Sequence, residues 1–163
     1  MIKLAITGGI GSGKSHVARQ MTELLGIPVY DSDSNAKRLN EESPEIRRGL
    51  IEMVGADVYD VQGRLNRQKL ASFLFASEEN VRRINALIHP VVKEDFLRWA
   101  AGQTAPVVAI ETALLAESGI DKIVDKIIRV DAPLETRISR AMQRDSVARE
   151  KVLERMAHQQ EYP

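Results

Sequence analysis

The residues with the clearest chemical potential lie between Gly8 and Ser15, in the stretch GGIGSGKS. This stretch matches the phosphate-binding pattern G-x-x-x-x-G-K-[ST] at every fixed position. Triphosphate oxygens need many hydrogen-bond donors at close range, and a glycine-rich backbone can fold into a nest whose N–H groups point inward. We therefore predict a nucleotide-binding loop, whose expected contacts are Gly9, Ile10, Gly11, Ser12, Gly13, Lys14, Ser15 and His16.

Lys14 and Ser15 add two specific groups to this loop. The ammonium group of Lys14 would bring a full positive charge to the β- and γ-phosphates, and the hydroxyl of Ser15 is a ligand suited to the Mg²⁺ that bridges them. The structural alternative is a glycine-rich turn that simply joins a strand to a helix. The motif does lie between a predicted strand and a predicted helix, which is the context that a phosphate-binding loop requires.

Three carboxylates follow predicted strands, at the sheet edge where ligands bind in open α/β folds. Asp31 and Asp33 come after a strand at residues 27–30 and would face the same side if the chain stayed extended. One could accept a proton from an acceptor hydroxyl while the other holds a water bound to Mg²⁺; a pair of turn or helix-capping aspartates is the alternative. Glu111, after a strand at residues 106–110, is the candidate for orienting Mg²⁺, although an ordinary polar strand end would look the same.

Three arginines, Arg137, Arg140 and Arg144, recur at spacings of three and four and so share one face of a predicted helix. A charged face of this kind is usually solvated. Here it follows a predicted strand of the core, and Ser146 is expected to open the next helix. We therefore expect a helical lid whose arginines close on the γ-phosphate and offset the charge that develops during transfer.

The spacing of apolar residues supplies the elements that must hold these groups. Residues 2–6 predict a buried strand, residues 14–25 a helix that ends at Gly26, and residues 27–30 a second strand. This order favours a parallel sheet. Further strands are predicted at 106–110 and 126–130, and Ser77 should open a helix that ends at His89-Pro90, followed by another from about Val91. The fold class is α/β, with a charged helical insertion between the second and third strands.

The composition limits the classes of protein that this chain can belong to. Its 163 residues, 44% apolar and 28% charged, are typical of one compact globular domain. Lysine plus arginine (23) balances aspartate plus glutamate (23), so no basic field indicates nucleic acid, and the absence of cysteine excludes disulfides and thiolate metal sites. No apolar run suits a membrane span and no signal-peptide layout precedes the first strand, so we expect a cytoplasmic protein. Its oligomeric state is open.

Three classes of nucleotide protein compete for the glycine loop. A GTPase should carry an N-K-x-D guanine clamp, which is absent, and the D-x-x-G match at residues 60–63 lies in a polar turn. A transport ATPase of the ABC type should carry an L-S-G-G-Q signature, which is also absent. A kinase should carry carboxylates at strand ends and a mobile arginine-rich segment. Both features are present, so a phosphotransferase is favoured.

The chain resembles the dephospho-CoA kinase family in several segments that occur together and in order. They are ITGGIGSGKS, the D-x-D pair of Asp31 and Asp33, GRLNRQKLASFLF, LIHPVV, ALLAESG and RAMQRD. The loop is generic, whereas D-x-D, L-N-R and His-Pro together are quite specific. The resemblance spans essentially the whole chain and implies a P-loop three-layer fold, similar to nucleoside monophosphate kinases, with a parallel sheet, a helical acceptor-binding insertion and a helical lid.

The resemblance also implies a reaction, the transfer of the γ-phosphate of ATP to the ribose 3′-hydroxyl of dephospho-CoA with Mg²⁺. Another small hydroxyl acceptor, such as a nucleoside or sugar, is the alternative, and a non-catalytic nucleotide-binding domain is a more distant one. The residues expected at catalysis are Asp33 as the base, with Lys14 and Arg140 at the phosphates; Arg144 joins the ATP contacts. The residues expected at the acceptor are Asp31, Asp33, His89, Pro90 and Leu114, and those at the metal are Ser15 and Glu111.

Two departures from the family pattern stand out. The family usually shows D-x-P-L-L-F-E after the third strand, where this chain has ETALLAE, so Glu111 replaces Asp and Ala113 replaces Pro, while Glu117 keeps the last carboxylate. Family members also continue past the position of Pro163, so we expect a truncated polypeptide. The expected organisation is a nucleotide-binding core at 1–33 and 103–136, an acceptor-binding region at 34–102, and a lid with the start of a C-terminal helix at 137–163.

Overall fold

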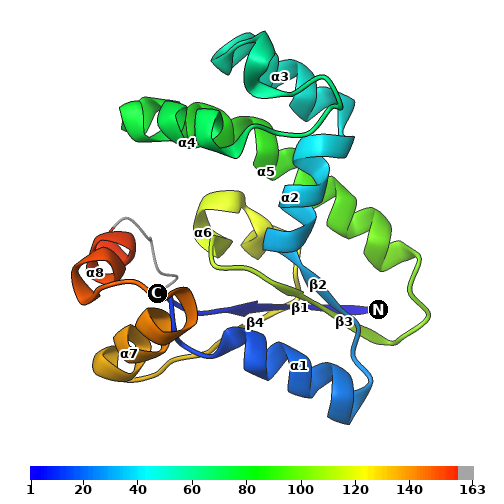
Figure 1. Cartoon of the computed structure of the whole chain (residues 1–163). Coiled ribbons are helices and arrows are strands. Elements are labelled where there is room, and N and C mark those ends of the chain that lie inside the picture. The colour runs from blue at the N-terminus through cyan, green and yellow to red at the C-terminus, as the bar shows by residue number, and fades with distance from the viewer. Residues whose placement is uncertain (158–163) are drawn as a thin grey trace. The chain divides into compact units, whose positions relative to one another are not determined.

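The computed structural model describes residues 1–157 (Figure 1). The expectation that the last helix continues through the final six residues, HQQEYP, lies outside this range. The strands are β1 (Ile2–Thr7), β2 (Val29–Asp31), β3 (Val107–Glu111) and β4 (Lys126–Arg129). The helices are α1 (Lys14–Leu25), α2 (Ser32–Glu42), α3 (Pro44–Val54), α4 (Arg67–Ala76), α5 (Glu78–Ala101), α6 (Leu115–Ser118), α7 (Leu134–Asp145) and α8 (Arg149–Ala157), with 3₁₀ turns at Ala56–Val58 and Ile120–Lys122.

The four strands form one parallel sheet in the order β2-β3-β1-β4. The central strand β1 pairs with both β3 and β4, which explains why its last three residues before the loop, Ala5 to Thr7, are buried. Helix α1 packs on one face of this sheet, where Ala18 meets Ile6 and Ala109 in an apolar cluster. The predicted α/β class with a parallel sheet is therefore confirmed.

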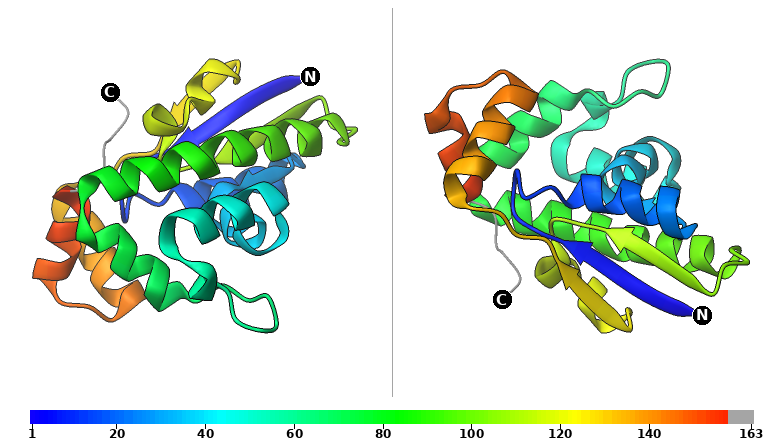
Figure 2. Two further views of the ribbon diagram at one scale, coloured as in Figure 1. Left: turned by 90° about the horizontal axis from the view of Figure 1, so that it is seen from above. Right: turned by 90° about the horizontal axis from the view of Figure 1, so that it is seen from below.

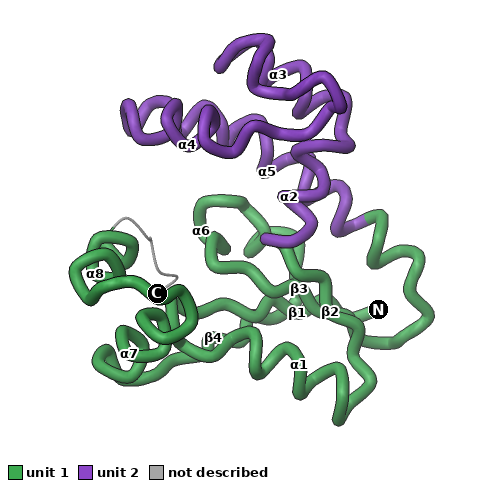
Figure 3. Tube along the Cα trace, viewed as in Figure 1, with its two compact units in different colours: residues 1–32, 98–163 green, residues 33–97 purple. Residues whose placement is uncertain are grey.

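The chain divides into two compact units (Figure 3). Unit 1 comprises residues 1–32 and 98–163, and its described part holds the sheet, α1 and the α7–α8 hairpin. Unit 2 comprises residues 33–97 and is helical. Within unit 1, the carboxyl ends of the strands, the loop after β1 and the α7–α8 hairpin lie together (Figures 1 and 2). No helix in the described part of the chain is both long and apolar enough to cross a membrane.

The helix expected to end at His89-Pro90 does not end there. Helix α5 runs unbroken from Glu78 to Ala101 with Pro90 inside it. Proline removes one backbone hydrogen bond from a helix interior, but tertiary packing can offset that loss. Buried residues on both sides of Pro90, namely Ile84, Val92 and Phe96, supply such packing, so the prediction of two helices was wrong.

Ser146 is also placed differently from the prediction. It follows α7 in the left-handed conformation, with φ of 53°, and its backbone N–H donates to the carbonyl of Met142. Ser146 therefore ends α7 as a C-cap rather than opening α8, which begins at Arg149. A serine next to a helix boundary predicts a cap, but the sequence alone does not say which of two adjoining helices it caps.

Candidate active site

The loop between β1 and α1 has the conformation that its glycines permit. Gly11 and Gly13 have φ of 75° and 98°, in the left-handed region where a side chain is strained. Gly8 is confined in another way, because a Cβ there would overlap the carbonyl of Val130 and the hydroxyl of Ser12. The loop closes through a hydrogen bond from Ser12 N–H to the carbonyl of Gly9 at 3.1 Å. The backbone after β1 is thus a tight turn directly ahead of a helix N-terminus, an arrangement that favours anions.

Helix α1 begins at Lys14, so Lys14, Ser15 and His16 occupy its first turn. The N–H groups of a first turn have no partner within the helix, and the helix dipole adds positive potential at that end. The half-buried Lys14 adds a full charge at the same point. The predicted nucleotide contacts Gly9 to His16 therefore form one continuous segment that ends in a helix N-terminus.

The hydroxyl of Ser15 donates a hydrogen bond to the carboxylate of Glu111 at 2.5 Å, across 96 positions of sequence. Glu111 is the last residue of β3 and lies in register with Asp31, the last residue of β2. Residues in register on neighbouring parallel strands point to the same face, so the two carboxylates lie side by side at the carboxyl edge of the sheet. The two predicted metal ligands are thus in direct contact, with a second carboxylate on the adjacent strand.

This donor set suits Mg²⁺ in a kinase site, where one or two protein oxygens act together with phosphate oxygens and water. A closed protein cage for a metal is not seen: within residues 1–157 no three histidine, cysteine, aspartate or glutamate side chains gather as a ligand set. The hydroxyl and carboxylate oxygens of Ser15 and Glu111 are hard ligands of the type that Mg²⁺ prefers.

Asp33 has a different backbone setting from the one that its spacing predicts. Asp31 ends β2, but Ser32 already begins α2, so Asp33 lies in the first turn of a helix. The expectation that both aspartates share one side of an extended chain was therefore wrong. A carboxylate in a first turn is stabilised by the helix dipole. Both aspartates are exposed, so either one is accessible to a ligand from solvent.

The three predicted lid arginines lie in three different environments on α7. Arg140 donates from Nη1 to the loop carbonyls of Gly11 and Ser12, each at 3.3 Å. Arg137 is buried, and its Nε donates to the carbonyl of Ile10 at 3.1 Å. The more exposed Arg144 binds the carboxylate of Asp145 at the end of α7. Arg137 and Arg140 thus contact the carbonyls of the loop, whereas Arg144 binds Asp145, and closure of the three arginines on the γ-phosphate stays a prediction.

The predicted acceptor residues are distributed over both units. His89 and Pro90 lie in the middle of α5 in unit 2, and His89 is half-buried. Leu114 is in unit 1, directly before α6, where its N–H donates to the hydroxyl of Thr112 at 3.1 Å. That turn is the segment in which ETALLAE departs from the family pattern.

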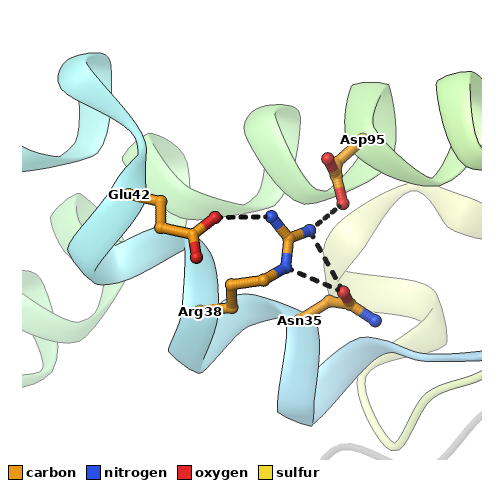
Figure 4. A network of polar contacts seen from close by, with 4 residues as sticks. All are labelled: Asn35, Arg38, Glu42 and Asp95. Carbon is orange, nitrogen blue, oxygen red and sulfur yellow. Dashed lines mark hydrogen bonds and ion pairs between the residues drawn. The ribbon is translucent and has the colours of Figure 1, made fainter.

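A polar network within unit 2 joins α2 to α5 (Figure 4). The guanidinium of Arg38 on α2 donates to Asp95 on α5 at 2.6 Å, to Glu42 at 3.0 Å, and to Asn35 at 3.1 and 3.2 Å. Asp95 is mostly buried, with 18% of its side chain exposed. The helix that carries Asp33 is thereby fixed to the helix that carries His89. Sequence reasoning missed the contact between the two helices because Arg38 and Asp95 are 57 positions apart.

The turn before α4 is also held by its own polar residues. The side chain of Asn66, in the L-N-R segment, caps α4 by accepting from the N–H of Lys69 at 3.1 Å. Tyr59 donates its hydroxyl to the carbonyl of Asn40 at 2.5 Å, and Arg47 lies 4.1 Å from the centre of its ring. Burial raises the pKa of Tyr59. Asn66 of the L-N-R segment thus has a local structural role as the N-cap of α4.

Comparison with known proteins gives a consistent result over nearly the whole chain. A family model described as dephospho-CoA kinase matches residues 2–162. A dephospho-CoA kinase of Porphyromonas gingivalis is 47% identical over 98% of this chain and 78% of its own length. A solved structure of a Thermus thermophilus protein, 38% identical, superposes with a TM-score of 0.80 over 98% of this chain and 80% of that one. A shikimate kinase of Acinetobacter baumannii, at 19% identity and a TM-score of 0.52 over 96% of this chain and 74% of that one, shares the fold.

Proposed function

Since this chain belongs to the dephospho-CoA kinase family, we propose that it transfers the γ-phosphate of ATP to the ribose 3′-hydroxyl of dephospho-CoA, which gives coenzyme A. The observation that carries this proposal is the family match over residues 2–162, together with a loop and helix N-terminus built for a polyphosphate. The acceptor is assigned by the family, because a phosphate loop alone serves many kinases.

The loop residues Gly9 to His16 bind the phosphates of ATP in this proposal. Backbone N–H groups and the start of α1 donate to the phosphate oxygens, and Lys14 neutralises charge on the β- and γ-phosphates. Ser15 and Glu111 would hold Mg²⁺, which when bound would offset the charge on the transferred phosphoryl group. Their 2.5 Å contact supports this assignment, because it shows that two hard ligands from distant segments reach one point.

Asp33 accepts the proton of the acceptor hydroxyl, and the adjacent Asp31 orients the acceptor. A general base must reach the hydroxyl that it deprotonates, and the exposed first turn of α2 leaves Asp33 accessible to solvent. His89, Pro90 and Leu114 complete the acceptor contacts. Residues 34–102, which separate the two parts of the nucleotide core (1–33 and 103–136) in the sequence, supply the acceptor-binding region.

Arg140 and Arg144 contact ATP from α7, and the segment from residue 137 onward acts as the lid. Arg140 supports this role because its guanidinium already lies on the loop carbonyls. An arginine in this position can follow the charge that develops on the γ-phosphoryl group during transfer. The partners in this proposal are the two small substrates, ATP and dephospho-CoA.

The proposal is tested by comparing acceptors under identical conditions. ATP consumption is measured with dephospho-CoA, with adenosine and with simple sugars, and kcat/KM is determined for each. We expect dephospho-CoA to exceed every other acceptor by about 10²-fold or more, since sites that bind several polar groups reject analogues that lack them. A nucleoside or sugar that equals dephospho-CoA would contradict the proposal, and ATP binding without any transfer would indicate a non-catalytic domain.

A further inference from the structure

The first turns of α7 hold the phosphate loop at three consecutive residues. The side chain of Ile10 packs against the apolar cluster of Ile138, Ala141 and Val152, which joins α7 to α8. At Gly11 the contact is so close that a Cβ would overlap the backbone carbonyl of Arg137. Arg140 reaches the carbonyls of Gly11 and Ser12 from the next turn. The hairpin thus packs directly on the loop through both backbone and side chains.

Arg137 makes the most specific of these contacts. Its side chain is buried, at 8% exposure, which is unusual for a guanidinium and requires hydrogen-bonding partners. One of these partners is the carbonyl of Ile10, 3.1 Å from Nε. The predicted role of a lid arginine on the γ-phosphate requires a mobile and accessible side chain, and Arg137 is neither exposed nor directed to solvent.

The bond to Ile10 fixes the direction of a neighbouring donor. The peptide bond between Ile10 and Gly11 is trans and planar, so the N–H of Gly11 points away from the side to which the Ile10 carbonyl points. When Arg137 holds that carbonyl, it also aims the Gly11 N–H away from α7. This peptide plane turns through paired changes in ψ of Ile10 and φ of Gly11, and Gly11, with φ of 75° and no side chain, restricts its own angle little.

We propose that Arg137 is a positioning residue of the phosphate loop, which holds the Ile10–Gly11 peptide plane so that the Gly11 N–H is available to an ATP phosphate. This inference rests on the proposed use of the loop as the ATP site. Arg137 acts on ATP through the loop and does not touch it. Its effect therefore belongs to the affinity for ATP, and neither the chemical step nor acceptor binding depends on it.

Three substitutions of Arg137 separate the hydrogen bond from the charge. Arg137→Leu removes both. Arg137→Gln places an amide nitrogen at the same number of bonds from Cα as Nε, so the bond to Ile10 is kept while the charge is lost. Arg137→Lys keeps the charge but moves the donor one atom further out. Arg149→Leu is the matched control, because it removes an arginine of the same hairpin whose guanidinium binds Glu135 at 2.7 and 2.8 Å rather than the loop.

The measurement is calorimetric binding of Mg-ATP without acceptor, followed by steady-state kinetics and thermal unfolding of each variant. We expect Arg137→Leu to weaken ATP binding and raise the KM for ATP about tenfold, the effect of losing one charge-assisted hydrogen bond. The kcat and the affinity for dephospho-CoA should stay within about threefold of the parent. Arg137→Gln should bind ATP within about threefold of the parent, and Arg137→Lys should resemble Arg137→Leu.

The inference is overturned if Arg137→Leu binds ATP like the parent, or if Arg149→Leu weakens ATP equally. It is also overturned if Arg137→Lys binds ATP like the parent and Arg137→Gln does not, since the charge of Arg137 would then determine ATP binding. If Arg137→Leu fails to fold, the ATP affinities of Arg137→Gln and Arg137→Lys are compared instead. Tighter binding by Arg137→Gln supports the inference, and tighter binding by Arg137→Lys overturns it. ATP binding is measured without acceptor, so it does not depend on transfer to dephospho-CoA. A protein that fails to phosphorylate dephospho-CoA would contradict the proposed function, while the ATP affinities of the Arg137 variants could still be compared.

Discussion

Asp31 and Asp33 are close in sequence but differ in backbone setting, and this difference separates their expected roles. Asp31 ends β2 in register with Glu111, beside the proposed metal ligands, whereas Asp33 lies in the first turn of α2. We expect Asp33→Asn to lower kcat by about 10² to 10⁴-fold, the usual range for loss of a general base, with both substrates still bound. Calorimetry with ATP and dephospho-CoA, beside turnover, checks this expectation.

Asp31→Asn is the matched comparison for that experiment. If Asp31→Asn is inactive and Asp33→Asn keeps most of its turnover, the two assignments are reversed. If neither variant loses activity, the pair has a structural role, and the first-turn position of Asp33 is explained by the helix dipole alone.

Arg140 is the lid arginine whose guanidinium lies on the loop and remains accessible. We expect Arg140→Ala to lower kcat and kcat/KM together by about 10²-fold, because the interaction is made mainly in the transition state. The KM for dephospho-CoA should change little. Steady-state kinetics in both substrates provide the check, and a change confined to KM would make Arg140 a ground-state binding residue.

The sequence predicts most of the residues that form the loop, but it predicts fewer of the contacts that these residues make. The pattern from Gly8 to Ser15 is local, so its strand, turn and helix follow from glycine and lysine positions alone. Arg137 was grouped with Arg140 and Arg144 because helical spacing shows which residues share a face, but it does not show which of them is buried. The carbonyl that the buried Arg137 binds belongs to Ile10, which is 127 positions away in the sequence.

At the level of elements, the Arg38 network joins α2 to α5 in unit 2 (Figure 4). We expect Asp95→Asn to lower the free energy of unfolding by about 1 kcal/mol, since Asp95 is mostly shielded from water and accepts a charge-assisted hydrogen bond. Urea denaturation measures the change. Glu42→Gln is the control, because Glu42 binds the same arginine with 62% of its side chain exposed and should change stability by less than about 0.5 kcal/mol. Equal losses in the two variants would contradict this reading.

The α7–α8 hairpin carries an ion pair with a predictable pH dependence. Hydrogen bonds from Arg149 lower the pKa of Glu135. The resulting stabilisation is present above the ordinary glutamate pKa of about 4.3 and is lost as the pH falls toward the lowered value of the folded state. The Tm of Glu135→Gln should therefore fall less steeply than the Tm of the parent as the pH is lowered from about 5 to 3. If the Tm of the parent and of Glu135→Gln fell in parallel with pH, the ion pair between Glu135 and Arg149 would not contribute to stability.

Element boundaries show where local patterns are sufficient and where they are not. Gly26 ends α1 in the left-handed conformation, as the sequence predicts, because glycine adopts it without strain. Pro90 should have ended a helix, but buried residues on both sides of it keep α5 continuous. Asp33 was expected in an extended segment, but α2 begins one residue earlier, at Ser32. Long-range packing decides the case of Pro90, and the exact start of α2 decides the case of Asp33.

For the whole molecule, the sheet order β2-β3-β1-β4 brings residues from distant segments to one edge. The order of strands in sequence predicts a parallel sheet, and the family resemblance predicts the rest of the architecture. The proposed chemistry needs this edge to act as one site, with Lys14 on the phosphates and Ser15 in contact with Glu111. The central claim is therefore about one reaction at one place.

The most direct test follows the phosphate itself. The protein is incubated with Mg-ATP and dephospho-CoA, and the product is identified by mass and by ³¹P resonance, in parallel with Lys14→Ala. We predict coenzyme A with a new phosphomonoester at the ribose 3′ position, and a rate that falls by about 10³-fold or more in Lys14→Ala. ATP hydrolysis without coenzyme A, or equal formation of coenzyme A by Lys14→Ala, would contradict the account.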